Sequence, residues 1–231
     1  MKFIFFYFCI FIPISFAFKV TPMVVDFDSQ GKDATQSFNV EHAGPDKIAV
    51  EVKVATRELS KKGEEIRNST KDLLAYPPQL ILGPGDKKKI RVSYIGQAFK
   101  GAQKSYRVIF KQLPVKLSKK KSNQKAQLNF LFEYVASAYV NGDDNGKEKV
   151  AIVSAKKIKA KKWKIVLKNT GDRHILLKNW RLIAESKGKQ RSVKLRLANG
   201  KELPNLLAGA TVEFVAAAKT NVKTIWKFSK K

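Results

Sequence analysis

Hydrophobic and polar residues alternate along most of the chain, and this alternation predicts β-strands rather than helices. The clearest run is IAVEVKVA at residues 48–55, in which every second residue is Ile or Val. The longest series covers residues 128–134, where Leu128, Phe130, Phe132 and Tyr134 take every second position. Such runs are typical of strands that have one buried and one exposed face.

Turn signals rich in Gly, Pro, Asn and Asp separate these runs at short intervals. They stand at residues 43–46 (AGPD), 83–86 (GPGD), 169–172 (NTGD) and 198–200 (ANG). Many short strands joined by such turns predict an all-β fold, and the chain length predicts two immunoglobulin-like β-sandwich domains. Residues 67–74 are interpreted as a brief helix.

The first 17 residues have the pattern of a secretory signal peptide. Lys2 provides a positive charge, residues 3–16 are almost wholly apolar, and Ser15-Phe16-Ala17 predicts cleavage after Ala17. The alternative is an uncleaved membrane anchor, but the apolar run is shorter than the ~20 residues that a spanning helix needs. Because Cys9 is the single cysteine and lies in this segment, we expect an exported, soluble chain without disulfides or stable membrane insertion.

Two polar stretches are candidate linkers. Residues 117–125 (LSKKKSNQK) are basic, and residues 141–149 (NGDDNGKEK) contain no apolar side chain. The alternating run between them is assigned to the first domain, whose sheet would otherwise be unfinished. The predicted organisation is a signal peptide at 1–17, a first domain at 18–140, a linker at 141–149 and a second domain at 150–231.

The chain is strongly basic, with a formal net charge of +27. Residues 18–140 contain 22 Lys and Arg against 12 Asp and Glu, a net charge of +10, and residues 141–231 contain 23 against 7, a net charge of +16. Such an excess favours contact with nucleic acid, anionic lipid or acidic protein. We predict no nucleic-acid partner, because neither an aromatic RNA-binding motif nor a recognition helix accompanies the charge.

The sequence has no pattern that indicates an enzyme or a cofactor. The two histidines, His42 and His174, are interpreted as loop or strand-end residues, and there is neither a metal-ligand pair nor a phosphate-binding glycine loop. Trp163, Trp180 and Trp226 all lie in the second half, where we expect them to pack in a core or at a sheet edge. We therefore predict a non-enzymatic protein that holds no metal and no cofactor.

The stretch from Pro77 to Pro114 is similar to a known family. It reads PPQLILGPGDKKKIRVSYIG and, after a short gap, KSYRVIFKQLP. A proline, a hydrophobic segment, a Pro-Gly turn, a basic alternating strand and a Tyr-Arg strand that ends at a proline follow one another. This order resembles the periplasmic chaperones of the chaperone–usher pathway. Val20-Thr21-Pro22 near the start fits the same family, and WKI at 163–165 and NTG at 169–171 fit it loosely.

The resemblance implies a periplasmic chaperone that binds a pilus or fimbrial subunit and delivers it to an outer-membrane usher. A pilus subunit is a sandwich that lacks one strand, and its open edge aggregates unless another strand pairs with it. The chaperone lends a strand, whose backbone pairs with this edge while alternate side chains fill the groove. Leu128, Phe130, Phe132 and Tyr134 are the candidate donor residues, because they follow a basic loop and precede the linker.

Two alternatives stay open. Alternation alone fits an ordinary inner strand of a sandwich as well as it fits a donor strand. For the chain as a whole, the alternative is a structural or adhesive β-sandwich protein of the envelope that binds anionic surfaces through its basic face.

The resemblance also implies two cations that hold the carboxylate at the end of the subunit. One is an arginine in the first strand, near Met23 to Val25, and the other is a lysine late in the donor strand, between Val135 and Ser137. This sequence has no cation in either place. Since a buried carboxylate without a cation is costly, Lys53 and Arg107 are the candidate replacements.

Overall fold

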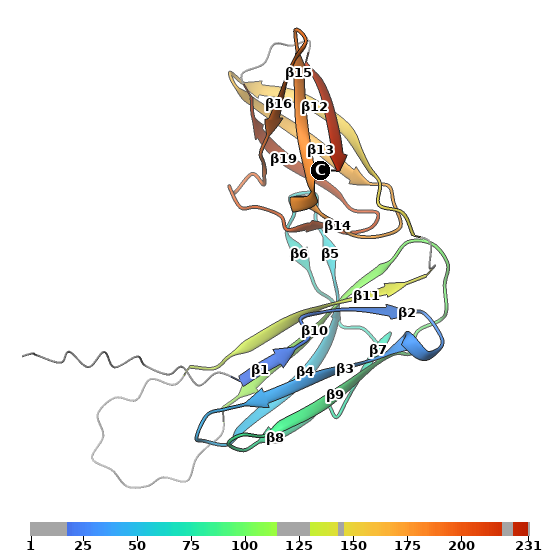
Figure 1. The fold of residues 1–231 in the computed structure, drawn as a ribbon, viewed down its shortest axis with the longest axis vertical. Helices are drawn as coiled ribbons and strands as arrows, with labels where there is room; N and C mark the ends of the chain where they lie inside the picture. Colours follow the sequence, from blue (N-terminus) through green and yellow to red (C-terminus); the bar gives the residue numbers. More distant parts are fainter. Residues whose placement is uncertain (1–17, 115–129, 143–145, 219–223, 231) are drawn as a thin grey trace, which may run out of the picture.

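The computed structural model describes residues 18–114, 130–142, 146–218 and 224–230, and the structural statements below concern these residues. The predicted signal peptide with Cys9, and the candidate donor residue Leu128, lie outside them. Figure 1 shows two lobes made of strands, the lower one coloured blue to yellow-green and the upper one mostly orange to red. The predicted all-β fold with two immunoglobulin-like sandwiches is confirmed.

The first lobe is a sandwich of two sheets. One sheet has the strand order β1-β3-β9-β7, and the other has the order β2-β11-β10-β4-β8. The bounds are β1 Phe18–Thr21, β2 Val24–Asp28, β3 Thr35–His42, β4 Ile48–Thr56, β7 Leu73–Tyr76, β8 Gln79–Leu82, β9 Lys87–Tyr94, β10 Lys104–Leu113 and β11 Glu133–Asn141. The chain changes sheets between β1 and β2, so that β2 pairs in parallel with the second half of β11. A single 3-10 turn, η1 (Lys32–Ala34), connects β2 to β3.

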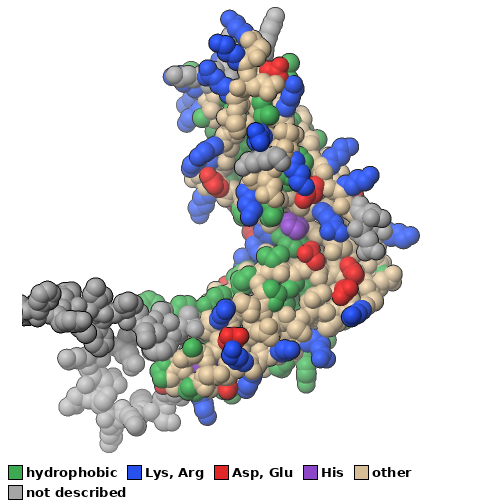
Figure 2. All heavy atoms as spheres, in the orientation of Figure 1, with side chains coloured by type: hydrophobic (Ala, Val, Ile, Leu, Met, Phe, Trp, Pro, Cys, Tyr) green, Lys and Arg blue, Asp and Glu red, His purple; other side chains and the backbone are tan. Residues whose placement is uncertain are grey.

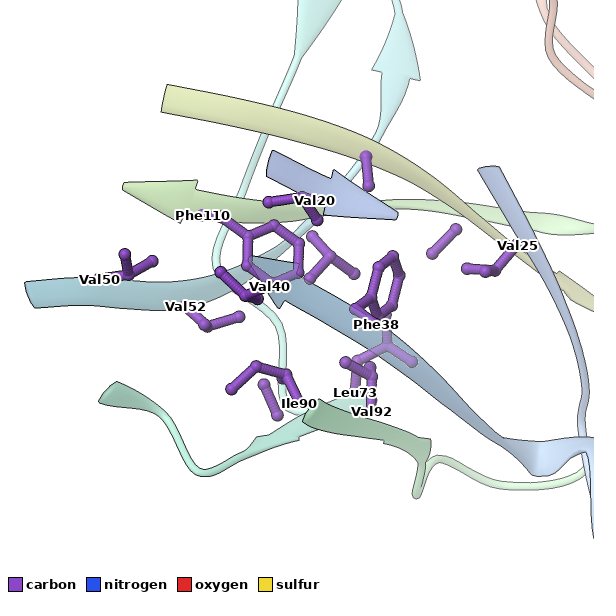
Figure 3. Close-up of a cluster of buried hydrophobic side chains, with 14 of the residues drawn as sticks. Val20, Val25, Phe38, Val40, Val50, Val52, Leu73, Ile90, Val92 and Phe110 are labelled. Atoms are coloured by element: carbon purple, nitrogen blue, oxygen red, sulfur yellow. The ribbon is translucent and has the colours of Figure 1, made fainter. Parts of the chain in front are cut away.

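Alternation along these strands produces the first hydrophobic core. Ile48, Val50 and Val52 of β4 are buried at every second position, and Figure 3 shows Val50 and Val52 in the cluster of buried side chains. Phe38 of β3 and Phe110 of β10 meet in the centre with their ring centroids 5.3 Å apart, and both are fully buried. Each buried side chain of this size stabilises the fold by roughly 1.5–3 kcal/mol before ordering costs.

The second lobe is a smaller sandwich. Its sheets have the orders β12-β13-β19-β17 and β16-β15-β20, with β14 and β18 forming a separate pair. The bounds are β12 Val150–Lys159, β13 Lys162–Asn169, β14 Ile175–Leu176, β15 Trp180–Ser186, β16 Lys189–Val193, β17 Leu195–Arg196, β18 Asn205–Leu206, β19 Thr211–Ala217 and β20 Ile225–Lys230, with the 3-10 turn η2 at Leu177–Asn179. The tryptophans pack as expected: Trp163 is buried in the core against Trp226, and Trp180 stacks on Phe228.

A short hairpin links the two lobes. Its strands, β5 (Glu58–Leu59) and β6 (Glu65–Ile66), rise from the first lobe toward the second in Figure 1. Leu59 packs against the second core, and the backbone N–H of Glu213 donates to the carbonyl of Lys61 at 2.8 Å. Gly63 turns the hairpin with a φ of +79°, a left-handed backbone conformation that favours glycine.

The brief helix expected at residues 67–74 is wrong. In its place Ser69 forms a bridge with Ala55, and Leu73 begins β7, which pairs with β9. A helix of so few residues is only marginally stable by itself, so pairing with the sheet decides the conformation of this segment. In the described part of the chain, no helix is long and apolar enough to cross a membrane.

Candidate functional site

The most distinctive backbone feature is a half-open edge on β11, on the side of the first lobe that faces the second lobe (Figure 1). One edge of β11 pairs with β10 along its length, from Glu133 opposite Lys111 onward. On the other edge β2 pairs only from Ser137 to Asn141, and the Ser137 N–H donates to the carbonyl of Met23 at 2.9 Å. Within the described residues, Glu133–Ala136 therefore has no partner on this side, and such an edge is a template for another strand.

Exposed apolar side chains surround this open edge. Phe130 is 69 % exposed and Leu131 is 53 % exposed, and both directly precede β11. Val24, at the start of β2, is 57 % exposed. An open edge next to exposed apolar groups is the pattern that β-sheet proteins normally avoid unless a partner covers it.

The candidate donor residues do not form one uniform row. Phe130 is exposed and lies before the strand, whereas Phe132 and Tyr134 are half-buried against the first core. The Tyr134 ring meets Phe18 edge-on with the centroids 4.7 Å apart. The regular strand begins at Glu133 rather than at Leu128, although the Phe132 carbonyl still accepts a hydrogen bond from the Gln112 N–H at 2.9 Å.

The reason for this difference is the end of the sandwich. Ala136, Ala138 and Val140 continue the same face of β11 and are fully buried in the core. Toward Phe130 the opposite sheet no longer covers this face. The side chains on it therefore change from buried at Ala136, through half-buried at Tyr134 and Phe132, to exposed at Phe130. The exposed part is therefore a continuation of the core-facing side of the strand.

An arginine cluster, formed by Arg57, Arg67 and Arg107 around Glu65, lies where the open edge ends. Arg107 holds the Glu65 carboxylate with Nε at 3.0 Å from Oε1 and Nη2 at 2.5 Å from Oε2. Arg67 Nε donates to Oε1 at 2.6 Å, and Arg57 Nε donates to Oε2 at 2.8 Å. Burial raises the pKa of Glu65, but the hydrogen bonds from Arg107 and Arg67 and the charges of Arg107 and Arg57 outweigh it and lower the pKa to about 2.

Sheet register places Arg107 beside the open edge. Arg107 of β10 lies directly opposite Ser137 of β11, and its Nη1 donates to Ser137 Oγ at 2.6 Å. Ser137 is also the residue at which β2 begins to pair. Lys53, the other candidate cation, is 62 % exposed and pairs with Glu51 at 3.0 Å, so it takes no part in the arginine cluster.

Arg57 also belongs to a polar network that joins the lobes. Its Nη1 donates to the Tyr139 hydroxyl at 2.9 Å, and its Nη2 donates to Asn205 Oδ1 at 2.9 Å. Asn205 Nδ2 completes the triangle by donating to the same hydroxyl at 2.7 Å. All three residues are buried, and Asn205 comes from the second lobe, so the network fixes one lobe against the other.

A second contact between the lobes involves His174. Its ring stacks on Tyr139 with centroids 3.8 Å apart and planes 8° apart, and its Nδ1 lies 2.8 Å from Gln103 Oε1. Burial lowers the pKa of His174, although Asp26 opposes this effect. The interpretation of His174 as a loop residue holds for its position in the chain, because it precedes β14, but its side chain packs between the lobes.

The molecule is hollowed on one side between the lobes, as Figure 2 shows. A cavity of about 440 Å³ lies at this junction and is lined by both lobes, with Arg57 and Tyr106 on one wall and Leu207 on the other. The Tyr106 hydroxyl donates to Asp72 Oδ2 at 2.6 Å, and burial together with this carboxylate raises the pKa of Tyr106. The described residues contain no group of three His, Cys, Asp or Glu side chains arranged to hold a metal ion.

A family model of pili and flagellar-assembly chaperones, covering the PapD N-terminal domain, matches residues 17–135. The chain belongs to this chaperone family. The family consists of periplasmic chaperones for pilus assembly, as the resemblance implied. A comparison with curated protein sequences gives no match.

Solved structures agree with this assignment at the level of the fold. The chaperone is similar to the CsuC–CsuE chaperone–tip adhesion subunit pre-assembly complex of Acinetobacter baumannii, with a TM-score of 0.55, 15 % identity, and coverage of 86 % of this chain and 89 % of that chain. It is also similar to the Salmonella enterica SafA pilin in complex with the SafB chaperone, with a TM-score of 0.58, 12 % identity, and coverage of 95 % and 99 %. The class 5 fimbriae chaperone CfaA gives a TM-score of 0.59 at 12 % identity, with coverage of 93 % and 100 %.

Sequence reasoning missed most of the polar residues of this chaperone's site. Glu65, Arg57, Arg67, Tyr139 and Asn205 were not singled out. A weak signal existed in Glu65 and Arg67, whose opposite charges stand two residues apart in a segment without apolar alternation. The contacts with Arg57 and Asn205 depend on the packing of the lobes, which no local pattern reveals.

Proposed function

We propose that this chaperone binds pilus subunits by strand addition at the open edge of β11 and delivers them to an outer-membrane usher. The observation that carries the proposal is the unpaired edge of Glu133–Ala136, which is continuous with exposed Phe130 and ends beside Arg107. A subunit that lacks a strand has the complementary defect, namely an open groove and unpaired backbone groups. Main-chain hydrogen bonds would then provide affinity, and side chains at alternate positions would provide specificity.

The donor residues in this proposal are Leu128, Phe130, Phe132 and Tyr134. Phe130 has the largest exposed apolar surface of the three described donors, so the subunit groove gains most by covering it. Burying a side chain of this size contributes roughly 1.5–3 kcal/mol before ordering costs. Phe132 and Tyr134 are partly held by the chaperone's own core and would share their surface between the two proteins.

The geometry also supports a direction for the subunit strand. Because β2 occupies the edge from Ser137 onward, an added strand must end beside Ser137, where Arg107 lies. A cation there favours the carboxyl end of the subunit over its amino end. The subunit strand would therefore run parallel to β11, as β2 does.

The proposal includes export and the division of the chain. Cleavage after Ala17 would make Phe18 the first residue of the mature protein, and Phe18 is 1 % exposed in the core at the start of β1. Two domains at 18–140 and 150–231, joined by a linker at 141–149, are supported by the two separate hydrophobic cores. Mass spectrometry of the protein recovered from periplasm tests the cleavage site directly.

Replacement of Phe130 by aspartate tests the strand addition. The side chain is mostly exposed, so the chaperone should fold normally while a co-expressed pilus subunit no longer co-purifies with it. Ile81→Asp is the matched control, because Ile81 is 62 % exposed on β8, at the opposite edge of the same sheet. Strand addition at β11 is refuted if Phe130→Asp retains the complex at the level of Ile81→Asp.

Binding of anionic surfaces is the second candidate function. Figure 2 shows Lys and Arg side chains spread over both lobes, and residues 141–231 carry 23 basic against 7 acidic groups. Attraction to an anionic surface weakens steeply with salt, whereas a strand-added complex is held mainly by backbone pairing and apolar contact. A complex that survives high salt therefore supports the chaperone proposal, and one that is lost supports surface binding.

A further inference from the structure

The Glu65 carboxylate is bound by Arg107, beside the end of the open edge. Both of its oxygens are bound by Arg107, in the two-pronged geometry with which arginine recognises carboxylates. Arg107 is in turn the member of the arginine cluster that touches Ser137, at the end of the open edge. A carboxyl group that arrived along this edge would meet a guanidinium that already holds a carboxylate.

Glu65 has other partners that could keep its charge compensated. Arg67 bonds Oε1 and Arg57 bonds Oε2, independently of Arg107. The cluster has three positive groups against one negative group, so it can accommodate a second anion. Release of Arg107 by Glu65 therefore leaves no unpaired carboxylate, while it frees one guanidinium at the edge.

We propose that Glu65 is a resident ligand of Arg107 that a subunit's terminal carboxylate replaces. The arginine cluster is then the binding site for a peptide carboxyl terminus, and Glu65 occupies this site when no subunit is bound. This inference rests on the proposed strand addition, because the added strand brings the carboxylate to Ser137. Its consequence is selectivity: an end that carries no carboxylate cannot displace Glu65 and binds by its strand alone.

The probe is a short N-acetylated peptide of alternating valine and threonine, labelled with a fluorophore and prepared as a free acid and as a carboxamide. Fluorescence anisotropy gives the dissociation constant of each form, and the ratio of amide to acid measures the contribution of the carboxylate. In Glu65→Gln this ratio should rise about tenfold over the wild-type ratio, because the competing charge is gone. In Arg107→Gln the ratio should fall to about one.

Glu64→Gln is the matched control, because Glu64 precedes Glu65 on the same hairpin but its side chain is exposed. It makes the same change in net charge, and it should leave the ratio within about twofold of wild type. Circular dichroism checks the fold of each variant. If Glu65→Gln does not fold, Glu65→Asp replaces it, since the shorter side chain keeps its charge but cannot hold Arg107 and the other arginines equally well.

The outcomes separate this inference from the proposed function. A ratio that rises in Glu65→Gln or Glu65→Asp, stays constant in Glu64→Gln and collapses in Arg107→Gln supports the exchange. If both peptide forms bind every variant equally, the exchange is overturned while strand addition stands. If neither form binds the wild-type chaperone, strand addition itself fails.

Discussion

Tyr139→Phe removes one oxygen atom from the polar network between the lobes and leaves the ring in place. That hydroxyl accepts hydrogen bonds from Arg57 Nη1 at 2.9 Å and from Asn205 Nδ2 at 2.7 Å. Arg57 is 5 % exposed and Asn205 is 7 % exposed, so water has little access to either donor. The substitution leaves two buried donors without this acceptor, and one of them is charged.

The cost follows from the kind of bond that is lost. A hydrogen bond from a charged group contributes about 1.5–3 kcal/mol, and one between neutral groups contributes about 1 kcal/mol. Arg57 keeps its bonds to Glu65 and to Asn205 Oδ1, which limits the loss. We therefore expect the free energy of unfolding to fall by about 2–3 kcal/mol, which lowers the urea midpoint by about 1–2 M for a domain of this size.

Urea unfolding followed by two signals measures this effect. All three tryptophans lie in the second lobe, so their fluorescence reports that lobe, whereas far-ultraviolet circular dichroism reports both. In Tyr139→Phe the fluorescence midpoint should fall and separate from the dichroism midpoint, because the lobes lose their coupling. Tyr76→Phe, at a position 71 % exposed, is the control. Identical midpoints in the two variants would refute the role of the network.

Three further predictions concern a close backbone contact and two titrating groups. Gly171→Ala should lower the unfolding temperature of the second lobe, because the added Cβ would lie 2.1 Å from the carbonyl oxygen of Lys147. Gly83→Ala is the control and should leave the unfolding temperature unchanged, because the nearest atom to its Cβ is 3.6 Å away; equal unfolding temperatures in the two variants would contradict the role of the Gly171 contact. Burial lowers the pKa of His174 below 6.5, so the unfolded chain binds the proton first and stability should fall as pH drops below 6.5. In His174→Phe the urea midpoint of unfolding should depend less steeply on pH. An unchanged pH dependence would exclude His174 as the source of the effect. Glu65, with a pKa lowered from 4.5 to about 2, adds stability that is present above pH 4.5 and lost as pH falls toward 2; Glu65→Gln should remove this acid-dependent loss, and a loss equal to that of wild type would exclude Glu65 as its source.

Local patterns in the sequence were sufficient to predict several of the longer strands. The alternation at 48–55 became β4, and the turn at 83–86 separates β8 from β9. These features depend on neighbouring residues only, because a period of two and a Gly-Pro turn act within a few positions. The same reasoning failed at 67–74, where pairing with β9 and the bridge to Ala55 decide the conformation.

The polar site could not be predicted in this way, because its members meet through register and lobe packing. Arg107 reaches Ser137 only because β10 and β11 pair with these two residues opposite each other. Glu65 reaches Arg107 because the β5–β6 hairpin turns at Gly63 between the lobes. The sequence did suggest Arg107 as a candidate cation, together with Lys53. It could not distinguish Arg107 from Lys53, which the structure places in an exposed pair with Glu51.

Strand register decides which side chains lie next to each other in a sheet. A cation on one strand can therefore lie beside the place where a relative has a cation on the neighbouring strand. The resemblance implies a lysine between Val135 and Ser137, and this chain has Ser137 there with Arg107 opposite it on the adjacent strand. In the proposed site the guanidinium would come from β10 instead of β11, and the Arg107 side chain is only 14 % exposed. A charge so enclosed is costly without a counter-ion. Glu65 provides that counter-ion, and under the proposed exchange a subunit carboxylate would take over this role.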